Sequence, residues 1–160
     1  GQYAHGNEPS HHTTYMYAYS GEHYKIADKV RYINNELYTD KPDGLSGNED
    51  CGQMSAWYIL SSMGFYPVNP SNGAYVFGSP LFDEVVLDIP GQKQFKISAK
   101  NNSDKNIYIQ SVSLNGKEHK YSYITHKEIL KGGELEFTMG PKPNKDFGKE
   151  KKYRPESIVY

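Results

Sequence analysis

Two short polar stretches of the chain carry side chains that can do acid–base chemistry. Residues 6–12 contain Glu8 followed by two histidines, and residues 47–57 contain the adjacent carboxylates Glu49 and Asp50. In both stretches a glycine and a carboxylate stand just before a predicted helix. A carboxylate at the mouth of a buried helix is costly unless it is hydrogen-bonded or takes part in chemistry. This shared plan predicts two loops that face one pocket.

Length and composition limit the classes of protein to which the chain can belong. Its 160 residues suit one domain or two small ones, and a net charge of −1 favours neither a nucleic-acid nor an anionic-membrane partner. The sequence contains no apolar stretch long enough for a membrane span and no amino-terminal signal. Because the chain starts without methionine and enters a motif almost at once, we expect it to be the carboxy-terminal piece of a longer protein.

Cysteine and aromatic residues narrow the chemistry further. Cys51 is the single cysteine, which excludes an internal disulfide and gives no zinc site. We expect it to be a small buried residue. The chain has fifteen tyrosines, and tyrosine can stack on sugar rings because it offers a flat apolar face and a polar edge. Most of them are expected to fill strands and helix faces, and Trp57, inside an apolar run, is expected to pack in the core.

Three helices are predicted in the first 66 residues. The first begins near Pro9 and runs to about Ser20, where Gly21 ends it. The second covers residues 22–38 and has one apolar stripe. The third covers residues 52–63 and is apolar on almost every side, so it should be buried on most sides. These helices do not complete a helical domain, so helical neighbours outside this chain are expected.

The sequence changes to short β-rich runs after residue 66. A tight hairpin turn is predicted at Asn115-Gly116. We therefore predict an α+β chain in which residues 1–66 are helical, residues 67–148 form an antiparallel β-sandwich-like region and residues 149–160 are a polar tail, extended or disordered. The predicted strands cover residues 74–77, 84–89, 94–99, 107–114 and 134–139.

Read together, the two polar stretches resemble glycoside hydrolase family 92, the calcium-dependent α-mannosidases. The sequences that carry the resemblance are Gly-Asn-Glu-Pro-Ser-His-His at residues 6–12 and Gly-Asn-Glu-Asp-Cys-Gly-Gln-Met-Ser-Ala-Trp-Tyr at residues 47–58. The resemblance implies that the three helices are the last ones of an (α/α)6 barrel and that the strands form a carboxy-terminal β region beside it. Shorter matches lie at residues 42–45, 64–68, 77–82, 101–103, 108–110 and 114–116.

The resemblance also implies an inverting mechanism, in which one carboxyl protonates the leaving oxygen and a second activates water from the opposite face. In the family the base lies in the second motif, which points to Asp50. Asn48 would help to hold the water, and Glu49 is placed with them in the catalytic group. A purely structural alternative is that Asp50 caps the helix that follows, because aspartate satisfies free N–H groups at helix starts.

Glu8 is the second carboxylate, and the resemblance places it in substrate binding on the leaving-group side, together with Asn7 and His12. The general acid of the family lies further upstream, outside this chain, so the chain alone should be inactive. Glu8 as the acid, or as a cap or ion-pair partner, stays open. Members selective for α-1,2 linkages carry histidine where this chain has Asn7, so α-1,3, α-1,4, α-1,6 and phosphate-linked mannose are open.

The resemblance implies a calcium ion (Ca2+) as cofactor. The position that matches a metal contact of the family falls near His11. Calcium prefers oxygen ligands, so His11 could serve only through its backbone carbonyl. The alternative is that His11 and His12 are polar or hydrogen-bonded residues of the loop. Two adjacent histidines with no further clustered Cys or His lack the ligand spacing of a zinc site.

The expected partners are an α-mannose-containing glycan, such as an N-glycan or a mannan, and the rest of the parent chain. The family implies a periplasmic or extracellular, cell-surface location. Two other classes of protein stay open. One is another (α/α)6 carbohydrate enzyme, a lyase or a phosphorylase, and the other is a non-catalytic carbohydrate-binding or structural module.

Overall fold

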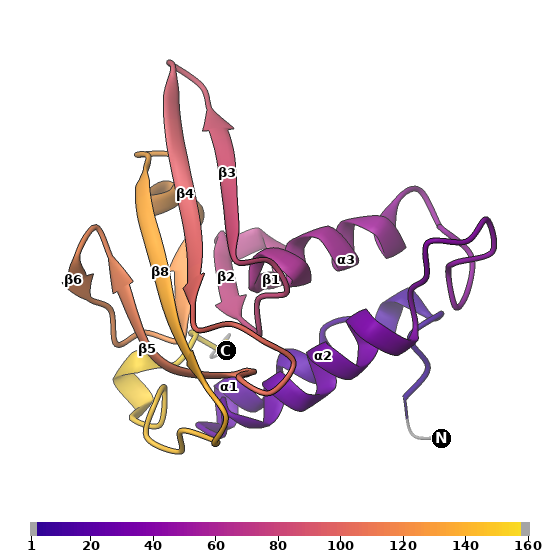
Figure 1. The fold of residues 1–160 in the computed structure, drawn as a ribbon, viewed down its shortest axis with the longest axis horizontal. Coiled ribbons are helices and arrows are strands. Elements are labelled where there is room, and N and C mark those ends of the chain that lie inside the picture. The colour runs from indigo at the N-terminus through magenta and orange to yellow at the C-terminus, as the bar shows by residue number, and fades with distance from the viewer. Residues whose placement is uncertain (1–2, 158–160) are drawn as a thin grey trace.

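The computed structural model describes residues 3–157, in which a group of helices packs beside two β-sheets (Figure 1). The mixed α+β class predicted from the sequence is confirmed. The first predicted helix is instead broken into three short turns, although Gly21 ends the last of them with a φ of 81°. Adjacent threonines and tyrosines are poor helix formers, which accounts for the breaks. The turns are η1 (Glu8–Ser10), η2 (Thr13–Tyr15) and α1 (Tyr17–Ser20).

Helix α2 (Lys25–Glu36) is shorter than predicted at both ends but has the predicted stripe. Ile26 and Val30 are completely buried, and Ile33 is nearly so. Apolar residues at this spacing share one face of a helix, and here that face packs into the helical core.

Helix α3 (Gln53–Met63) ends where predicted, at Gly64, whose φ is 104°. Trp57 is completely buried, as expected. One side of α3 is uncovered in the described chain, where Ile59 is 55% exposed, and the prediction assigns that side to helical neighbours outside this chain. The apolar residues of α3 therefore extend beyond the neighbours that residues 3–157 supply.

The strands described in residues 3–157 form two sheets. The three-stranded sheet has the order β1-β2-β7, and the five-stranded sheet has the order β3-β4-β8-β5-β6. The strands are β1 (Phe65–Asn69), β2 (Ala74–Phe77), β3 (Glu84–Ile89), β4 (Lys93–Lys100), β5 (Tyr108–Leu114), β6 (Lys117–Glu118), β7 (Tyr123–Thr125) and β8 (Gly133–Gly140), with a short helix, α4 (His126–Ile129), between the last two.

The prediction of a wholly antiparallel β region is wrong at one pair. Strands β4 and β8 run parallel, with Ala99 opposite Phe137. The reason is topological, because β8 returns late in the chain and inserts between β4 and β5. The predicted hairpin turn is confirmed, with φ angles of 52° at Asn115 and 75° at Gly116.

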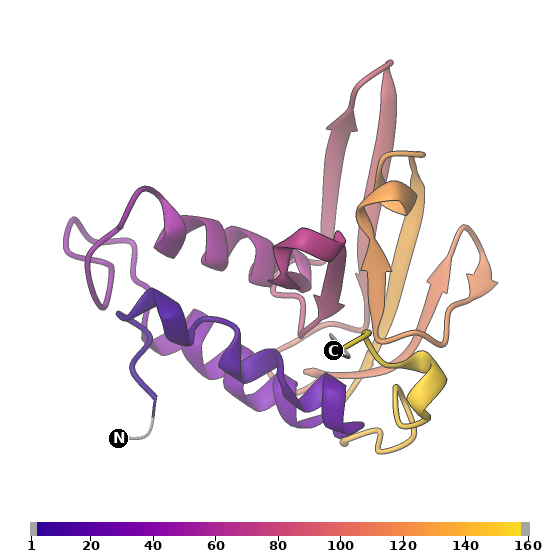
Figure 2. The ribbon, with the colours of Figure 1, turned by 180° about the vertical axis from the view of Figure 1, so that it is seen from behind.

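Helix α3 joins the two hydrophobic cores that are formed by described residues. One core fills the β region and includes Phe77 and Phe137, and the other lies among the helices and includes Trp57. Leu60 of α3 packs against both cores. Seen from behind, the helices lie to one side of the five-stranded sheet (Figure 2), and the β3–β4 hairpin projects away from them.

Buried Arg31 also ties the helices to the β region. Its guanidinium donates hydrogen bonds to Ser79 Oγ at 3.0 Å, to the Pro80 carbonyl at 2.5 Å and to Asn102 Oδ1. The side chain is 5% exposed, and burial lowers its pKa. This one side chain of α2 therefore contacts two loops of the β region.

The prediction of an extended or disordered tail is wrong for residues 149–157. They include a turn, η4 (Lys151–Tyr153), whose last carbonyl accepts a hydrogen bond from Ser122 N at 2.9 Å. Arg154 then donates to the Tyr19 carbonyl at 3.4 Å. These long-range bonds hold a polar segment that the local sequence alone does not order. Residues 158–160, which the same prediction covers, lie outside the described residues.

Candidate active site

The two polar loops meet, as the sequence predicts, and they meet through glycines. A Cβ added to Gly6 would lie 2.5 Å from the Ser46 carbonyl oxygen, and one added to Gly47 would lie 2.6 Å from the Gly6 Cα. Any side chain at either position would therefore push the loops apart. The two glycines allow the backbones to touch and bring the following carboxylates to one place.

The second loop reaches helix α3 through three successive residues in the left-handed region. The φ angles are 41° at Asp50, 60° at Cys51 and 88° at Gly52. Two of these residues carry side chains, for which this conformation costs free energy, and such strained residues cluster at active sites and ligand-binding loops. Cys51 is exposed, so the expectation of a buried residue is wrong; it lies in this left-handed turn, before helix α3 begins.

The carboxyls of Asp50 and Glu8 interact across the loop junction. A hydrogen bond with Glu8 raises the pKa of Asp50, and repulsion between the two like charges raises it further. The pKa of Asp50 is raised because its charged form is disfavoured beside a second carboxyl group. Glu8 Oε1 is also buried, with no hydrogen-bond partner among residues 3–157.

Glu49, next to Asp50, accepts hydrogen bonds at the start of α3. Its Oε1 accepts a hydrogen bond from Ser55 N at 3.0 Å, and its Oε2 accepts one from Ser55 Oγ at 2.7 Å. These bonds lower the pKa of Glu49. Glu49 therefore satisfies a free N–H in the first turn of α3, the role considered for Asp50, whereas the Asp50 side chain interacts with Glu8. A catalytic role of Glu49 stays a prediction.

A hollow of about 250 Å³ lies beside the loop junction. Glu8, His11 and His12 reach it from the first loop, and Gln53 reaches it from α3. Three predicted site residues, Asp50, Asn7 and Asn48, are exposed on the loops and do not line it, and Glu49 does not line it either. The sequence analysis did not single out the two further lining residues with polar side chains, Gln53 and Tyr66. The nearest signal for Gln53 is its place in the second motif.

The residues described here do not by themselves supply a complete calcium site, and the His11 carbonyl as a ligand stays a prediction. The His11 carbonyl, which the resemblance nominated as a ligand, accepts a hydrogen bond from Trp57 Nε1 at 3.0 Å, and His11 itself is 1% exposed. Within residues 3–157 no three His, Cys, Asp or Glu side chains cluster as a metal would require. Calcium takes six to eight oxygen ligands, and this donor set falls short of that.

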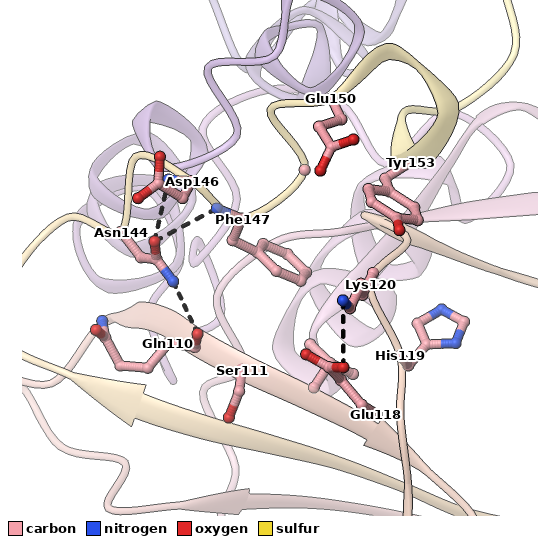
Figure 3. A pocket seen from close by; sticks show the side chains of 12 residues that line it. Gln110, Ser111, Glu118, His119, Lys120, Asn144, Asp146, Phe147, Glu150 and Tyr153 are labelled. Carbon is pink, nitrogen blue, oxygen red and sulfur yellow. Dashed lines mark hydrogen bonds and ion pairs between the residues drawn. The ribbon is translucent and has the colours of Figure 1, made fainter.

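A second hollow, of about 210 Å³, lies on the β region (Figure 3). Phe147 points into it, and Glu118 forms an ion pair with Lys120 at 3.4 Å on its wall. The Asn144 side chain is hydrogen-bonded to the backbone, since its Nδ2 donates to the Gln110 carbonyl at 2.8 Å. None of the carboxylates of the two motifs reaches this hollow, so the loop junction is the candidate active site.

Comparison with known proteins agrees with the sequence motifs. A profile of the glycosyl hydrolase family 92 catalytic domain matches residues 1–141. The chain therefore belongs to glycosyl hydrolase family 92. A curated relative, an uncharacterized secreted glycosidase from Arthroderma benhamiae, is 34% identical over 138 residues, which is 84% of this chain and 18% of that protein.

Solved structures of the same family share the fold. The GH92 α-mannosidase BT3965 from Bacteroides thetaiotaomicron is 42% identical with a TM-score of 0.94, and the match covers 100% of this chain and 22% of that one. The GH92 inverting mannosidase BT2199 from the same organism is 44% identical with a TM-score of 0.92, over 98% of this chain and 21% of that one. The chain thus spans about a fifth of these relatives, which agrees with the expectation of a longer parent protein. No helix within residues 3–157 has the length and apolar character needed to cross a membrane.

Proposed function

We propose that the parent protein is an inverting α-mannosidase and that Asp50 is its general base. The assignment rests on one observation, that two adjacent carboxylates make different contacts. Glu49 satisfies the start of α3 through Ser55, whereas Asp50 stands on an exposed, strained turn and faces Glu8. On this proposal the three helices belong to an (α/α)6 barrel that the rest of the parent completes.

The chemistry is a single displacement. The Asp50 carboxylate takes a proton from water while the water oxygen bonds to the anomeric carbon, and the bond to the leaving oxygen breaks as an acid protonates it. Asn48 can orient this water by hydrogen bonding but cannot take its proton. The two carboxyls of an inverting pair stand roughly 6.5–9.5 Å apart. Glu8 is assigned to substrate binding, with Asn7 and His12, and the general acid is assigned to the part of the parent outside this chain, as the family resemblance implies.

The substrate class is an α-mannoside of N-glycans or mannans. The solved relatives named α-mannosidases support it, and one of them, 42% identical, is in complex with mannoimidazole. An extracellular location is supported by the relative named a secreted glycosidase. Calcium dependence rests on the family resemblance alone, since the described residues supply no ligand set, and no step of the proposal uses it.

The test is mannose release by the full-length parent from a panel of α-linked mannobioses, with and without a calcium chelator and in buffer free of phosphate. The proposal predicts release of mannose from at least one linkage without phosphate. Cleavage that requires phosphate would indicate a phosphorylase. Binding without cleavage of any linkage, with or without added calcium, would indicate a carbohydrate-binding module. The 160-residue chain alone should release no mannose.

A further inference from the structure

The side-chain amide of Gln53 lies between two ring systems beneath the hollow. Its Nε2 is 3.1 Å from His11 Nδ1 and 3.0 Å from the Tyr66 hydroxyl oxygen. Gln53, His11 and Tyr66 all line the hollow that Glu8 also reaches. This network comes from three separate elements: the first loop, α3 and β1.

The state of His11 fixes the orientation of the amide. His11 Nε2 lies 2.9 Å from the His5 carbonyl oxygen and must therefore donate its proton there. Burial lowers the pKa of His11, so the ring is neutral at ordinary pH and Nδ1 carries a lone pair. Only the NH2 side of the Gln53 amide can bond to that lone pair, and its second N–H then points to the Tyr66 oxygen.

This orientation leaves one acceptor and one donor uncommitted at the hollow. Gln53 Oε1 accepts no hydrogen bond from any residue in 3–157, and the Tyr66 hydroxyl hydrogen has no acceptor there. Burial raises the pKa of Tyr66, so the phenol keeps its proton. A sugar hydroxyl donates one hydrogen bond and accepts others, and it is therefore complementary to such a pair.

The Gln53 amide and the Tyr66 hydroxyl are held in fixed positions. The Tyr66 ring stacks on Tyr15 at a centroid distance of 5.3 Å and is 9% exposed, and Gln53 is held at both N–H groups. Rigid polar groups discriminate well, because a substrate that lacks the matching hydroxyl leaves them unpaired.

We propose that Gln53 and Tyr66 are specificity-determining residues that recognise one hydroxyl of the bound mannoside through Gln53 Oε1 and the Tyr66 O–H. This inference rests on the proposed mannosidase function and adds two residues to its site. Glu8, whose buried Oε1 lacks a partner among residues 3–157, serves a neighbouring hydroxyl of the same sugar.

The test uses the full-length parent and α-mannosides that each lack one hydroxyl. In the unmodified enzyme one deoxy substrate should lose about tenfold in kcat/KM relative to the parent substrate. Tyr66→Phe should lower kcat/KM on the complete substrate by a similar factor. The same variant should cleave that deoxy substrate no more slowly than the unmodified enzyme does. Gln53→Met, which removes the acceptor, should give the same pattern. Tyr15→Phe is the matched control, because the Tyr15 hydroxyl donates to buried Ser61 at 2.8 Å and not into the hollow; it should leave the ranking of substrates unchanged.

The outcomes separate this inference from the function on which it rests. The unmodified parent could cleave α-mannosides while Tyr66→Phe and Gln53→Met still lose as much kcat/KM on every deoxy substrate, relative to the complete substrate, as the unmodified enzyme does. In that case the two residues do not recognise a hydroxyl and the inference is wrong. If the unmodified parent cleaves no α-mannoside, the proposed function fails and the inference fails with it. A melting temperature of Tyr66→Phe close to that of Tyr15→Phe shows that any change in ranking does not come from unfolding.

Discussion

Glu49 caps helix α3 through a single residue, Ser55, whose N–H and Oγ both donate to the Glu49 carboxylate at 3.0 and 2.7 Å. The neighbouring carboxylate, Asp50, makes no such bond and faces the other loop. Two acidic residues that look equivalent in sequence therefore have separate roles, one at the helix and one at the loop junction.

Replacement of Glu49 should act mainly on stability. Glu49→Ala removes this acceptor and should lower the melting temperature of the parent by about 1 °C. Because the bonds to Ser55 lower the pKa of Glu49, the stabilisation is complete above the pKa of an unfolded glutamate and is lost as pH falls through the folded value. Thermal melts at pH 7 and pH 3.5 measure both effects. An unchanged melting temperature with complete loss of turnover would contradict the capping role.

Replacement of Asp50 should act on turnover. Asp50→Asn keeps the shape of the side chain but cannot take a proton, so kcat should fall by about 10²–10⁴-fold. The melting temperature should stay the same or rise, because the repulsion from Glu8 is removed. Steady-state kinetics and a thermal melt on the same preparation measure the two effects. Full activity of Asp50→Asn would show that another group is the base.

The glycine contact between the loops should be needed for activity. Gly47→Ala places a Cβ 2.6 Å from the Gly6 backbone, so the loops must separate and kcat/KM should fall. Gly91→Ala is the control, since its φ of 85° imposes backbone strain while an added Cβ meets nothing within 4 Å. Equal losses of activity in the two variants would mean that the loop contact has no special role.

Arg31 should be important for stability and not for chemistry. Arg31→Ala leaves the buried oxygens of Ser79 and Pro80 without their donor, and the free energy of unfolding should fall by about 3 kcal/mol. Lys29→Ala, on the exposed side of the same helix, should change it by less than about 0.5 kcal/mol. Denaturant melts of both variants measure the difference, and similar values would contradict the role of Arg31 in joining α2 to the β region.

His23 should make stability depend on pH. Burial lowers the pKa of His23 from 6.5 to about 4, and its Nε2 bonds to the Phe77 carbonyl at 2.9 Å. Between these pKa values the unfolded chain binds a proton that the folded chain does not, so stability falls as the pH drops from 6.5 towards 4, by about 1.4 kcal/mol per pH unit. The variant His23→Gln should lose this part of the slope, whereas His126→Gln, at an exposed position, should keep it. Denaturant melts between pH 5 and 8 provide the measurement. His5, whose pKa burial lowers to about 4, and His11, whose pKa burial also lowers, contribute to the slope that remains.

Local patterns predicted the regular elements well. The bounds of β2 and β3 follow from short β-rich runs between turn residues, and the end of α3 follows from Gly64. Strands β1, β6 and β7 were missed, and β1 begins at Phe65, inside the stretch predicted to be helical. The pairing of β7 with β2 places Val76 opposite Tyr123, far away in the chain. The parallel pairing of β4 with β8 is equally non-local and leaves no mark on either strand.

The sequence predicted the meeting of the two loops but not the roles within them. The glycines and carboxylates of both motifs are visible as residue types. The orientation of Asp50 and Cys51 depends on positive φ angles, which non-glycine residues rarely adopt and the sequence does not display. The position of Gln53 beside Tyr66 depends on the packing of α3 against β1, which is also a tertiary property.

The anomeric form of the first sugar released tests the central claim most directly. Proton NMR of the full-length parent acting on an α-mannoside should show β-mannose first, with the α form appearing later by spontaneous mutarotation, and Asp50→Asn should abolish the early signal. Early release of α-mannose would show retention and remove Asp50 from the role of an inverting base. Early release of mannose 1-phosphate in phosphate buffer would place the enzyme among the phosphorylases.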